Sequence, residues 1–437
     1  MSSRFTLQVP ANGLWHSAVR VQVTRSIKTV MATAALALIP CIPSAHATLV
    51  QILHSFQTSN DGRQPAAGLT LVGSTLYGTA STGGASGNGT VFSINSDGSN
   101  YQTLHSFQST ADGAVPYAGL TQVGSSLYGT ASSGGTFGDG TVFSINPDGS
   151  NFQNLHSFQS STDGGSPFAG LTQVGSTLYG TAFTGGAYDD GTVFSINPDG
   201  SNPQTLYSFQ GSGDGAEPAA GLTLVGSTLY STAALGGTFG HGTVFSIHPD
   251  GSDLQTLHSF QGIGGDGAVP GAGLTLVGST LYGTTGAGGT FNHGTVFSVN
   301  VDGSDFQTLH SFQDAGGDGS TPGAGLTQVG STLYGTTYYG GTLGFGTVFS
   351  INVNGSDFQI LHSFQANGSD GAVPEAGLTL DGSTLYGTTY GGGAFGSGTV
   401  FAISVPEPST VTLAATGLLG LAGWGWRQRR RGQTTLR

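Results

Sequence analysis

The chain has 437 residues, of which 78 are Gly and only 8% are charged. Between residues 48 and 404 one basic side chain, Arg63, stands against 22 acidic ones, so this span has a formal charge of −21. Such a charge repels phosphate backbones and excludes a nucleic-acid partner, whereas cations and neutral sugars remain acceptable ligands. The single cysteine, Cys41, excludes a disulfide framework and a thiolate metal site.

Residues 1–47 are typical of a secretory signal peptide with a long basic leading segment. Residues 29–43 are small and apolar, and Ala45-His46-Ala47 supplies an A-x-A cleavage pattern through Ala45 and Ala47. We therefore predict an exported protein whose mature chain begins at Thr48. The alternative for this segment is a short buried helix.

A motif that reads Leu-His-Ser-Phe then recurs seven times at a spacing of 51 or 52 residues. Its histidines, or the tyrosine in their place, are His54, His105, His156, Tyr207, His258, His310 and His362. A fixed period of this size is typical of a repeat architecture, in which every unit offers the same residues. A catalytic triad, by contrast, needs different residues at one place.

Each repeat contains four short candidate strands. In the unit at 119–158 they are 119–123, 126–131, 141–146 and 152–158, separated by a Gly-Ser turn, a Gly-rich loop at 132–140 and a Pro-Asp-Gly-Ser turn. Four antiparallel strands in about 50 residues match one blade of a propeller. Glycine is too frequent for helices.

The repeat span 48–404 begins with the equivalent of a fourth strand, residues 49–56, and ends with the equivalent of a third, residues 398–403. Pairing these two segments closes a ring. The sequence therefore predicts an all-β, seven-bladed β-propeller closed by the N-terminal strand. The alternative is an open β-solenoid, which needs no split repeat but does need capping units at both ends.

Residues 405–437 read as a sorting tail. Pro406-Glu407-Pro408 precedes 18 largely apolar residues, 409–426, which as a helix span roughly 27 Å at about 1.5 Å per residue. A cluster that includes Arg429, Arg430 and Arg431 follows. This order resembles the PEP-CTERM tail of Gram-negative bacteria. The resemblance implies an exosortase-type sorting protease as partner, a membrane helix before processing, cleavage near Pro406-Glu407-Pro408, and delivery to the cell surface or extracellular matrix. An ordinary membrane anchor is the alternative.

In a propeller the loops after the second and fourth strands of each blade share one face, and here those loops are long and differ between copies. Such variation on a fixed scaffold is typical of a binding surface, although unconstrained drift would also produce it. Aromatic residues in these loops are the candidate ligand contacts, with local packing as the alternative. We single out Tyr117, Phe168, Tyr188, Tyr338, Tyr339 and Tyr390, alongside Phe183, Phe291, Phe345 and Phe395.

Every loop after a fourth strand also carries Asp-Gly. Asp112, Asp163 and Asp266 are the candidate calcium ligands, but one carboxylate per loop falls short of six to eight oxygens, and a turn-capping role is favoured. We expect no cofactor and no other metal. The motif histidines are spread around the ring, so we expect them to hydrogen-bond to a neighbouring strand or loop.

The repeat also resembles a known family. Gly221-Leu222-Thr223, residues 226–230 and residues 242–245 match the GloVer tandem repeat, and the likeness extends over nearly all of 48–404; Ser231 departs from it by replacing a Gly. The resemblance implies an exported, surface-anchored repeat protein and no established activity.

We therefore expect a monomeric, non-catalytic binding or matrix module for extracellular polysaccharide or a protein partner. A polysaccharide hydrolase or lyase needs dissimilar polar residues in one place, and the departures Arg63, Glu217 and Glu375 belong to separate copies. A purely structural envelope component is the third possibility.

Overall fold

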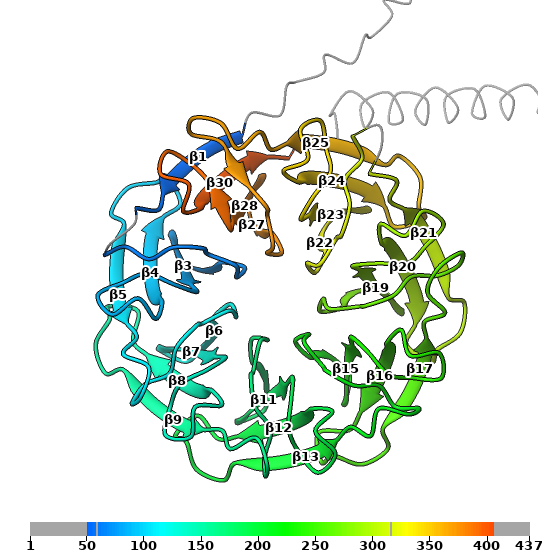
Figure 1. Ribbon diagram of the computed structural model, residues 1–437, viewed down its shortest axis with the longest axis horizontal. Coiled ribbons are helices and arrows are strands. Elements are labelled where there is room, and N and C mark those ends of the chain that lie inside the picture. Colours follow the sequence, from blue (N-terminus) through cyan, green and yellow to red (C-terminus); the bar gives the residue numbers. More distant parts are fainter. Residues whose placement is uncertain (1–49, 58–59, 315–316, 406–437) are drawn as a thin grey trace, which may run out of the picture. The chain divides into compact units, whose positions relative to one another are not determined.

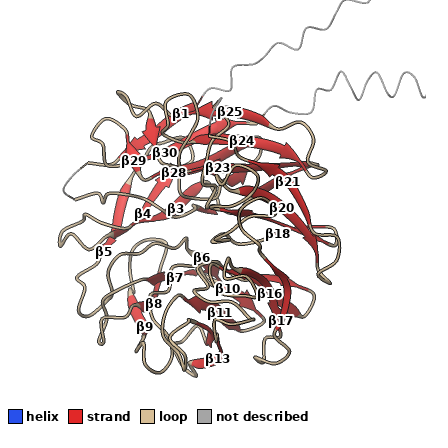
Figure 2. Cartoon of the chain, turned by 45° about the vertical axis from the view of Figure 1, so that its right-hand side comes forward, coloured by secondary structure: helices blue, strands red, loops and turns tan. Residues whose placement is uncertain are grey.

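The computed structural model describes residues 50–57, 60–314 and 317–405, and within these ranges every regular element is a β-strand. Seven four-stranded antiparallel sheets, the blades, stand around one axis with their shortest strands innermost (Figure 1). Figure 2 shows the same blades turned by 45° about the vertical axis, with the loops that join their strands. The prediction of a seven-bladed propeller is confirmed, and the solenoid alternative is wrong.

The blades are numbered 1 to 7 in the order of their innermost strands. These strands are β2 (Thr70–Val72), β6 (Thr121–Val123), β10 (Thr172–Val174), β14 (Thr223–Val225), β18 (Thr275–Val277), β22 (Thr327–Val329) and β27 (Thr379–Asp381). The second strands are β3 (Thr75–Ala80), β7 (Ser126–Ala131), β11 (Thr177–Ala182), β15 (Thr228–Ala233), β19 (Thr280–Thr285), β23 (Thr332–Thr337) and β28 (Thr384–Thr389).

The third strands are β4 (Thr90–Asn95), β8 (Thr141–Ile145), β12 (Thr192–Ile196), β16 (Thr243–Ile247), β20 (Thr295–Asn300), β24 (Thr347–Asn352) and β30 (Thr399–Ser404). The outermost strands are β5 (Gln102–Ser106), β9 (Gln153–Ser157), β13 (Gln204–Ser208), β17 (Gln255–Ser259), β21 (Gln307–Ser311), β25 (Gln359–Ser363) and β1 (Val50–Ser55). Two further short strands, β26 (Gly371–Ala372) and β29 (Gly391–Gly392), pair within the loops of blade 7.

The ring closes where the split repeat predicts. The outermost strand of blade 7 is β1, which pairs antiparallel with β30 so that Val50 lies opposite Ile403 and Ser55 opposite Thr399 (Figure 1). One buried cluster then joins Phe56 and Phe92 to Val400 of blade 7. The two ends of the repeat array are therefore held in one sheet and one core.

Threonine hydroxyls link neighbouring blades in two complete circles. The first residue of each innermost strand donates to a leucine carbonyl of the next blade, from Thr70 to Leu120 around to Thr379 and Leu69. A second circle uses the buried threonine of each second strand, such as Thr79, whose hydroxyl lies 2.9 Å from the carbonyl oxygen of Ala118. These bonds satisfy carbonyls near the axis that no strand covers.

The hydrophobic core lies between blades and not within one. In a typical cluster, Tyr77 and Val91 of blade 1 pack with Leu120, Leu127 and Phe143 of blade 2, and all are buried. Burying a side chain of this size contributes roughly 2–3 kcal/mol. Since each blade's face is covered only by its neighbour, an isolated blade has no core.

The two ends of the blades differ. Loops after the second and fourth strands pair with each other, as in the bridge between Arg63 and Thr82, and form what we call the loop face. The other end, the turn face, carries the tight turns, where Ser96 donates its amide to Ser74. The described chain also starts and ends here: Val50 begins β1, and the amide of Val405 donates to Ser383 in a turn.

The predicted signal peptide with Ala45 and Ala47, and the tail residues Pro406, Glu407, Pro408, Arg429, Arg430 and Arg431, lie outside the described residues. Among the residues that are described, no helix is long and apolar enough to cross a membrane.

Candidate functional site

The Leu-His-Ser-Phe motif is explained by its place on the outermost strands. Each of these strands carries a bulge. In β5, Thr103 pairs with Phe92 and His105 pairs with Val91, so that Leu104 is an extra residue without a partner on β4. The side chains of Leu104 and His105 therefore both turn toward the next blade, where Leu104 packs in the core and His105 stacks on Phe152 with ring centroids 3.7 Å apart. Phe107 then fills the same core.

The histidine of each motif hydrogen-bonds to the aspartate of the following loop. The His105 Nε2 lies 2.8 Å from the Asp112 carboxylate, which also accepts a hydrogen bond from the amide of Gln108. The tyrosine at the same place does likewise, since the Tyr207 hydroxyl donates to Asp214 at 2.8 Å. The pairs are His54–Asp61, His105–Asp112, His156–Asp163, Tyr207–Asp214, His258–Asp266, His310–Asp318 and His362–Asp370.

These pairs place the three candidate calcium ligands, Asp112, Asp163 and Asp266, in separate blades, each against its own imidazole. In the described ranges, no three His, Cys, Asp or Glu side chains gather as a metal site would require. Calcium at these loops stays a prediction. Burial lowers the pKa of four of the histidines, although each aspartate partner opposes the shift: His54, His105, His258 and His310.

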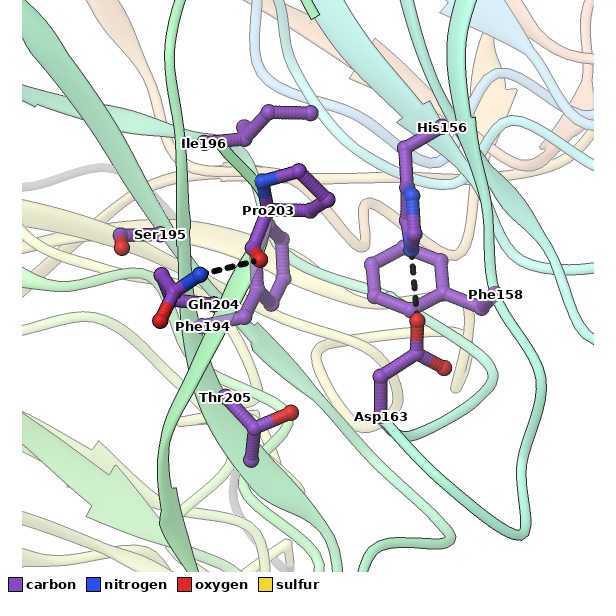
Figure 3. Close-up of a pocket in the computed structure, with 9 residues that line it drawn as sticks. All are labelled: His156, Phe158, Asp163, Phe194, Ser195, Ile196, Pro203, Gln204 and Thr205. Atoms are coloured by element: carbon purple, nitrogen blue, oxygen red, sulfur yellow. Dashed lines mark hydrogen bonds and ion pairs between the residues drawn. The ribbon is translucent and has the colours of Figure 1, made fainter. Parts of the chain in front are cut away.

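Four motif histidines stack on an aromatic ring of the next blade, and one of the positions without such a ring leaves a pocket. Where Phe152 stacks on His105, the corresponding partner of His156 is Pro203, which is too small to fill the space (Figure 3). The result is a cavity of about 90 Å³ between His156, Phe194 and Pro203. Its size and its repeat-related position identify it as a missing ring and not a built ligand site.

On the loop face, every loop that enters an innermost strand passes through a left-handed residue followed by proline. Val115 and Val373 have φ of 57° and 55°, and the equivalent residue of each other blade lies between 52° and 58°. β-Branched side chains are strained here, at roughly 1–3 kcal/mol each. The conformation aims the amide of Val115 at the carbonyl of Asn88 in the preceding blade, 2.9 Å away, and this bond too recurs around the ring.

The residue after this proline lies at the centre of the loop face and varies between blades. It is Ala66, Tyr117, Phe168, Ala219, Gly271, Gly323 and Glu375 in blades 1 to 7. The first residue after each second strand varies in the same way: Ser81, Ser132, Phe183, Ala234, Gly286, Tyr338 and Tyr390. We call the large members of both sets the axial cluster, which consists of Tyr117, Phe168, Phe183, Tyr338, Glu375 and Tyr390.

Contacts within blades and between them hold the axial cluster together, and the Tyr117–Phe168 contact joins blades 2 and 3. Ring centroids of Tyr117 and Phe168 are 5.7 Å apart, and those of Phe168 and Phe183 are 5.2 Å apart, both edge to face. The Tyr338 ring lies on Gly323, because a methyl group added there would come within 2.6 Å of it. At Gly271 an added methyl group would meet nothing within 4 Å, so this side of the cluster is open.

Glu375 is the carboxyl group of the axial cluster. Burial raises its pKa to about 7, and no described residue donates a hydrogen bond to it. Burial also raises the pKa of Tyr117 and Tyr338, and the nearby Glu375 carboxylate raises both further. Glu375 therefore changes charge near neutral pH while the phenols stay protonated donors.

The structure brings together four of the six aromatic residues singled out from the sequence: Tyr117, Phe168, Tyr338 and Tyr390. The other two are exposed, Tyr188 to 58% and Tyr339 to 53%, and the Tyr339 ring packs edge to face on that of Tyr338, with centroids 6.4 Å apart. Sequence reasoning had set Glu375 aside as a lone departure from the repeat. The sequence did carry a signal for Glu375, because Glu375 occupies the same position in its repeat that Tyr117 and Phe168 occupy in theirs.

Solved structures resemble the ring in fold alone. An oligogalacturonate lyase in complex with manganese is 10% identical, with a TM-score of 0.50 over 83% of this chain and 95% of that one. A puromycin-hydrolysing peptidase of Mycobacterium tuberculosis is 14% identical, with a TM-score of 0.50 over 83% of this chain and 55% of that one. No curated protein matches.

Two family models match the chain itself. The PEP-CTERM protein-sorting motif covers residues 404–431, which confirms the resemblance to a PEP-CTERM tail and indicates export and processing for display at the bacterial cell surface. The Gloeobacter/Verrucomicrobia repeat covers residues 43–238 and 184–401, as the resemblance to the GloVer repeat predicts. The chain therefore belongs to the Gloeobacter/Verrucomicrobia repeat family.

Proposed function

We propose that this protein is a non-catalytic binding module, displayed on a Gram-negative cell surface or in its matrix, that holds neutral extracellular polysaccharide at the axial cluster. The observation that carries the proposal is that seven near-identical blades vary at the centre of one face. There they gather aromatic rings and one carboxyl group from blades 2, 3, 6 and 7.

The chemistry of the cluster suits a sugar. Aromatic rings stack on the apolar faces of pyranose rings, and the phenols of Tyr117 and Tyr338 and the carboxyl group of Glu375 are partners for hydroxyl groups. Arg63 is the one Lys or Arg of residues 48–404, so the face offers little to an anionic polymer. Neutral chains are therefore favoured over acidic ones.

The direction of the chain supports display of this face. The described chain ends at Val405 on the turn face, where the match to the sorting motif also begins. A tether through that segment presents the opposite face, which carries the axial cluster, away from the attachment point.

Hydrolysis is the second candidate, because a carboxyl group with a pKa near 7 suits a proton donor. Glycosidases use two carboxyl groups about 5–10 Å apart, however, and the axial cluster holds one. Binding is therefore the function that the cluster supports better.

The test is a glycan-binding screen with full-length protein in mild detergent. Binding to a neutral glycan should fall at least about tenfold in Tyr338→Ala and in the more conservative Glu375→Gln. Ile263→Ala, at an exposed residue of the same face outside the axial cluster, is the control and should bind normally. Binding of acidic glycans alone, or equal binding by all variants, would refute the proposal; turnover that Glu375→Gln abolishes would establish the hydrolase instead.

A further inference from the structure

A second feature of the loop face is a circle of exposed apolar side chains, which we call the rim tips. Six blades carry a large apolar residue at the same position of the loop between the second and third strands, and blade 1 carries Ser86. The rim tips are Phe137, Tyr188, Phe239, Phe291, Leu343 and Phe395, with exposed fractions from 47% at Phe291 to 58% at Tyr188.

The loop geometry sets these side chains outward. Phe239 is the third residue of a four-residue turn in which the amide of Gly240 donates to the carbonyl of Gly237, at 3.2 Å. Phe395 occupies the same place in a turn closed between Gly396 and Gly393. A side chain at the apex of such a turn has no neighbouring strand to pack on.

The turns are tied to the outermost strands. The amide of Thr238 donates to the hydroxyl of Ser259 at 2.8 Å, and in blade 7 the amide of Ala394 donates to Ser55 at 3.3 Å. The same bond to the motif serine is present in every blade. The rim tips therefore lie over the outer strands, separate from the axial cluster and at equivalent places around the ring.

We propose that the rim tips dock the protein onto a surface of packed neutral polysaccharide chains. Six large apolar side chains exposed at one repeat position form a regular array on one face, and such an array suits a broad partner more than a small ligand. Five of the six are aromatic, as stacking on sugar faces requires. The charge of −21 over residues 48–404 opposes an anionic membrane and also a second acidic copy of this face.

This inference deepens the proposed function, since it names the physical form of the ligand and a second, multivalent contact. Several weak contacts to one solid surface act together, so affinity changes by a roughly constant factor for each tip gained or lost. The repeat provides safe substitutions, because blade 1 folds with serine at the tip position.

The experiment measures depletion of full-length protein by insoluble cellulose, chitin and β-1,3-glucan particles. Phe239→Ser should lower retention on a particle that binds the wild type. The triple variant with Phe137→Ser, Phe239→Ser and Phe395→Ser should lower the affinity for the particle by about the cube of the factor measured for Phe239→Ser alone. Ser86→Phe should raise retention. Leu224→Gln, at an exposed apolar residue of the innermost strand β14 where blades 2, 3 and 6 carry glutamine, is the matched control and should change nothing.

Retention that ignores the tip substitutions, or no retention on any particle, overturns the inference. So does tip-dependent binding to phosphatidylcholine vesicles, or tip-dependent dimerisation, without retention on polysaccharide. The two proposals fail separately: if Tyr338→Ala leaves soluble oligosaccharide binding intact while tip variants lose retention, the axial site fails and the rim stands. If instead Tyr338→Ala loses soluble oligosaccharide binding while the tip variants keep their retention on particles, the rim inference fails and the axial site stands.

Discussion

The hydroxyl of Thr379 donates a hydrogen bond to the carbonyl of Leu69, across 310 residues of chain. The same bond links every other pair of neighbouring blades, so the junction between the last and first blades is built like the rest. Only the outermost strand of blade 7 comes from the other end of the repeat array. The stability of the ring should therefore depend on β1.

Deletion of residues 1–57 removes β1, so that the edge of β30 is left unpaired. It also removes Phe56 from the buried cluster that contains Val400 of β30. An open sheet edge beside exposed core promotes aggregation. We expect this variant to be recovered mainly as aggregate, as measured by size-exclusion chromatography. Deletion of residues 1–45 alone keeps β1 and should give the monomeric elution volume of the full chain; soluble, monomeric protein without residues 1–57 would show that β1 is dispensable.

The aspartate that pairs with each motif histidine requires a hydrogen-bond donor, which need not be an imidazole. His258→Leu leaves the Asp266 carboxylate without its 2.7 Å partner and should lower the free energy of unfolding by about 1–3 kcal/mol. His258→Tyr reproduces the Tyr207–Asp214 arrangement and should cost less than half as much. Urea unfolding measures both, and equal losses would show that a tyrosine hydroxyl does not replace the imidazole donor beside Phe306.

The cavity at Pro203 should accept the ring that other blades place there. Pro203→Phe fills the space between His156 and Phe194, as Phe152 does beside His105. Stacking contributes about 0.5–1.5 kcal/mol beyond the buried area, and loss of the proline costs about 0.4–1 kcal/mol. We expect a net rise in unfolding free energy of about 1 kcal/mol.

Calorimetric melting checks the Pro203→Phe variant, with Phe306→Pro as the reciprocal change. The reciprocal variant should open an equivalent cavity beside His258 and lower the melting temperature. A lower melting temperature in Pro203→Phe would contradict this account, because Asn151 has the same left-handed φ, 53°, before Phe152 as Asn202 has, 54°, before Pro203.

The raised pKa of Glu375 predicts a pH dependence with a definite sign. Between about pH 4.5 and 7 the folded protein keeps the proton that the unfolded chain releases, so the free energy of unfolding falls as pH rises through this window. At 1.36 kcal/mol per pH unit, reduced for partial exposure, the fall is about 2 kcal/mol. Glu375→Gln should remove it.

The measurement is urea unfolding of wild type and Glu375→Gln at pH 5 and pH 8. Histidines with a lowered pKa act in the opposite direction. Below about pH 6.5 the unfolded chain takes up their protons and the folded protein does not, so the free energy of unfolding falls as pH falls. Their contribution is common to both proteins and cancels in the difference. Identical pH profiles for the two proteins would show that Glu375 ionises as an exposed carboxyl group does.

The ring was predictable because its evidence is local and repeated. The segment around His54 matches a fourth strand, and the segment around Val400 matches a third, so the closing pair follows from counting strands. The roles of leucine, serine and phenylalanine in the motif were not predictable, because the bulge at Leu104 and His105 is a register shift that no residue type announces.

The axial cluster was predictable only in part. Tyr117 and Tyr338 stand out as aromatic residues in variable loops, but Glu375 reads as an isolated change until blade 7 is placed two blades from blade 2. The rim tips show the converse. Phe137 and Phe239 look like ordinary loop residues, and only the turn geometry shows that six blades present one circle.

The central claim is that ligand binds at the axial cluster on the loop face. A crystal structure of the protein with a neutral oligosaccharide selected in the glycan screen tests it most directly. The account predicts a sugar ring stacked on Tyr338 with a hydroxyl group bonded to Glu375. A sugar bound on the turn face, or in the cavity beside Pro203 with the axial cluster empty, would contradict it.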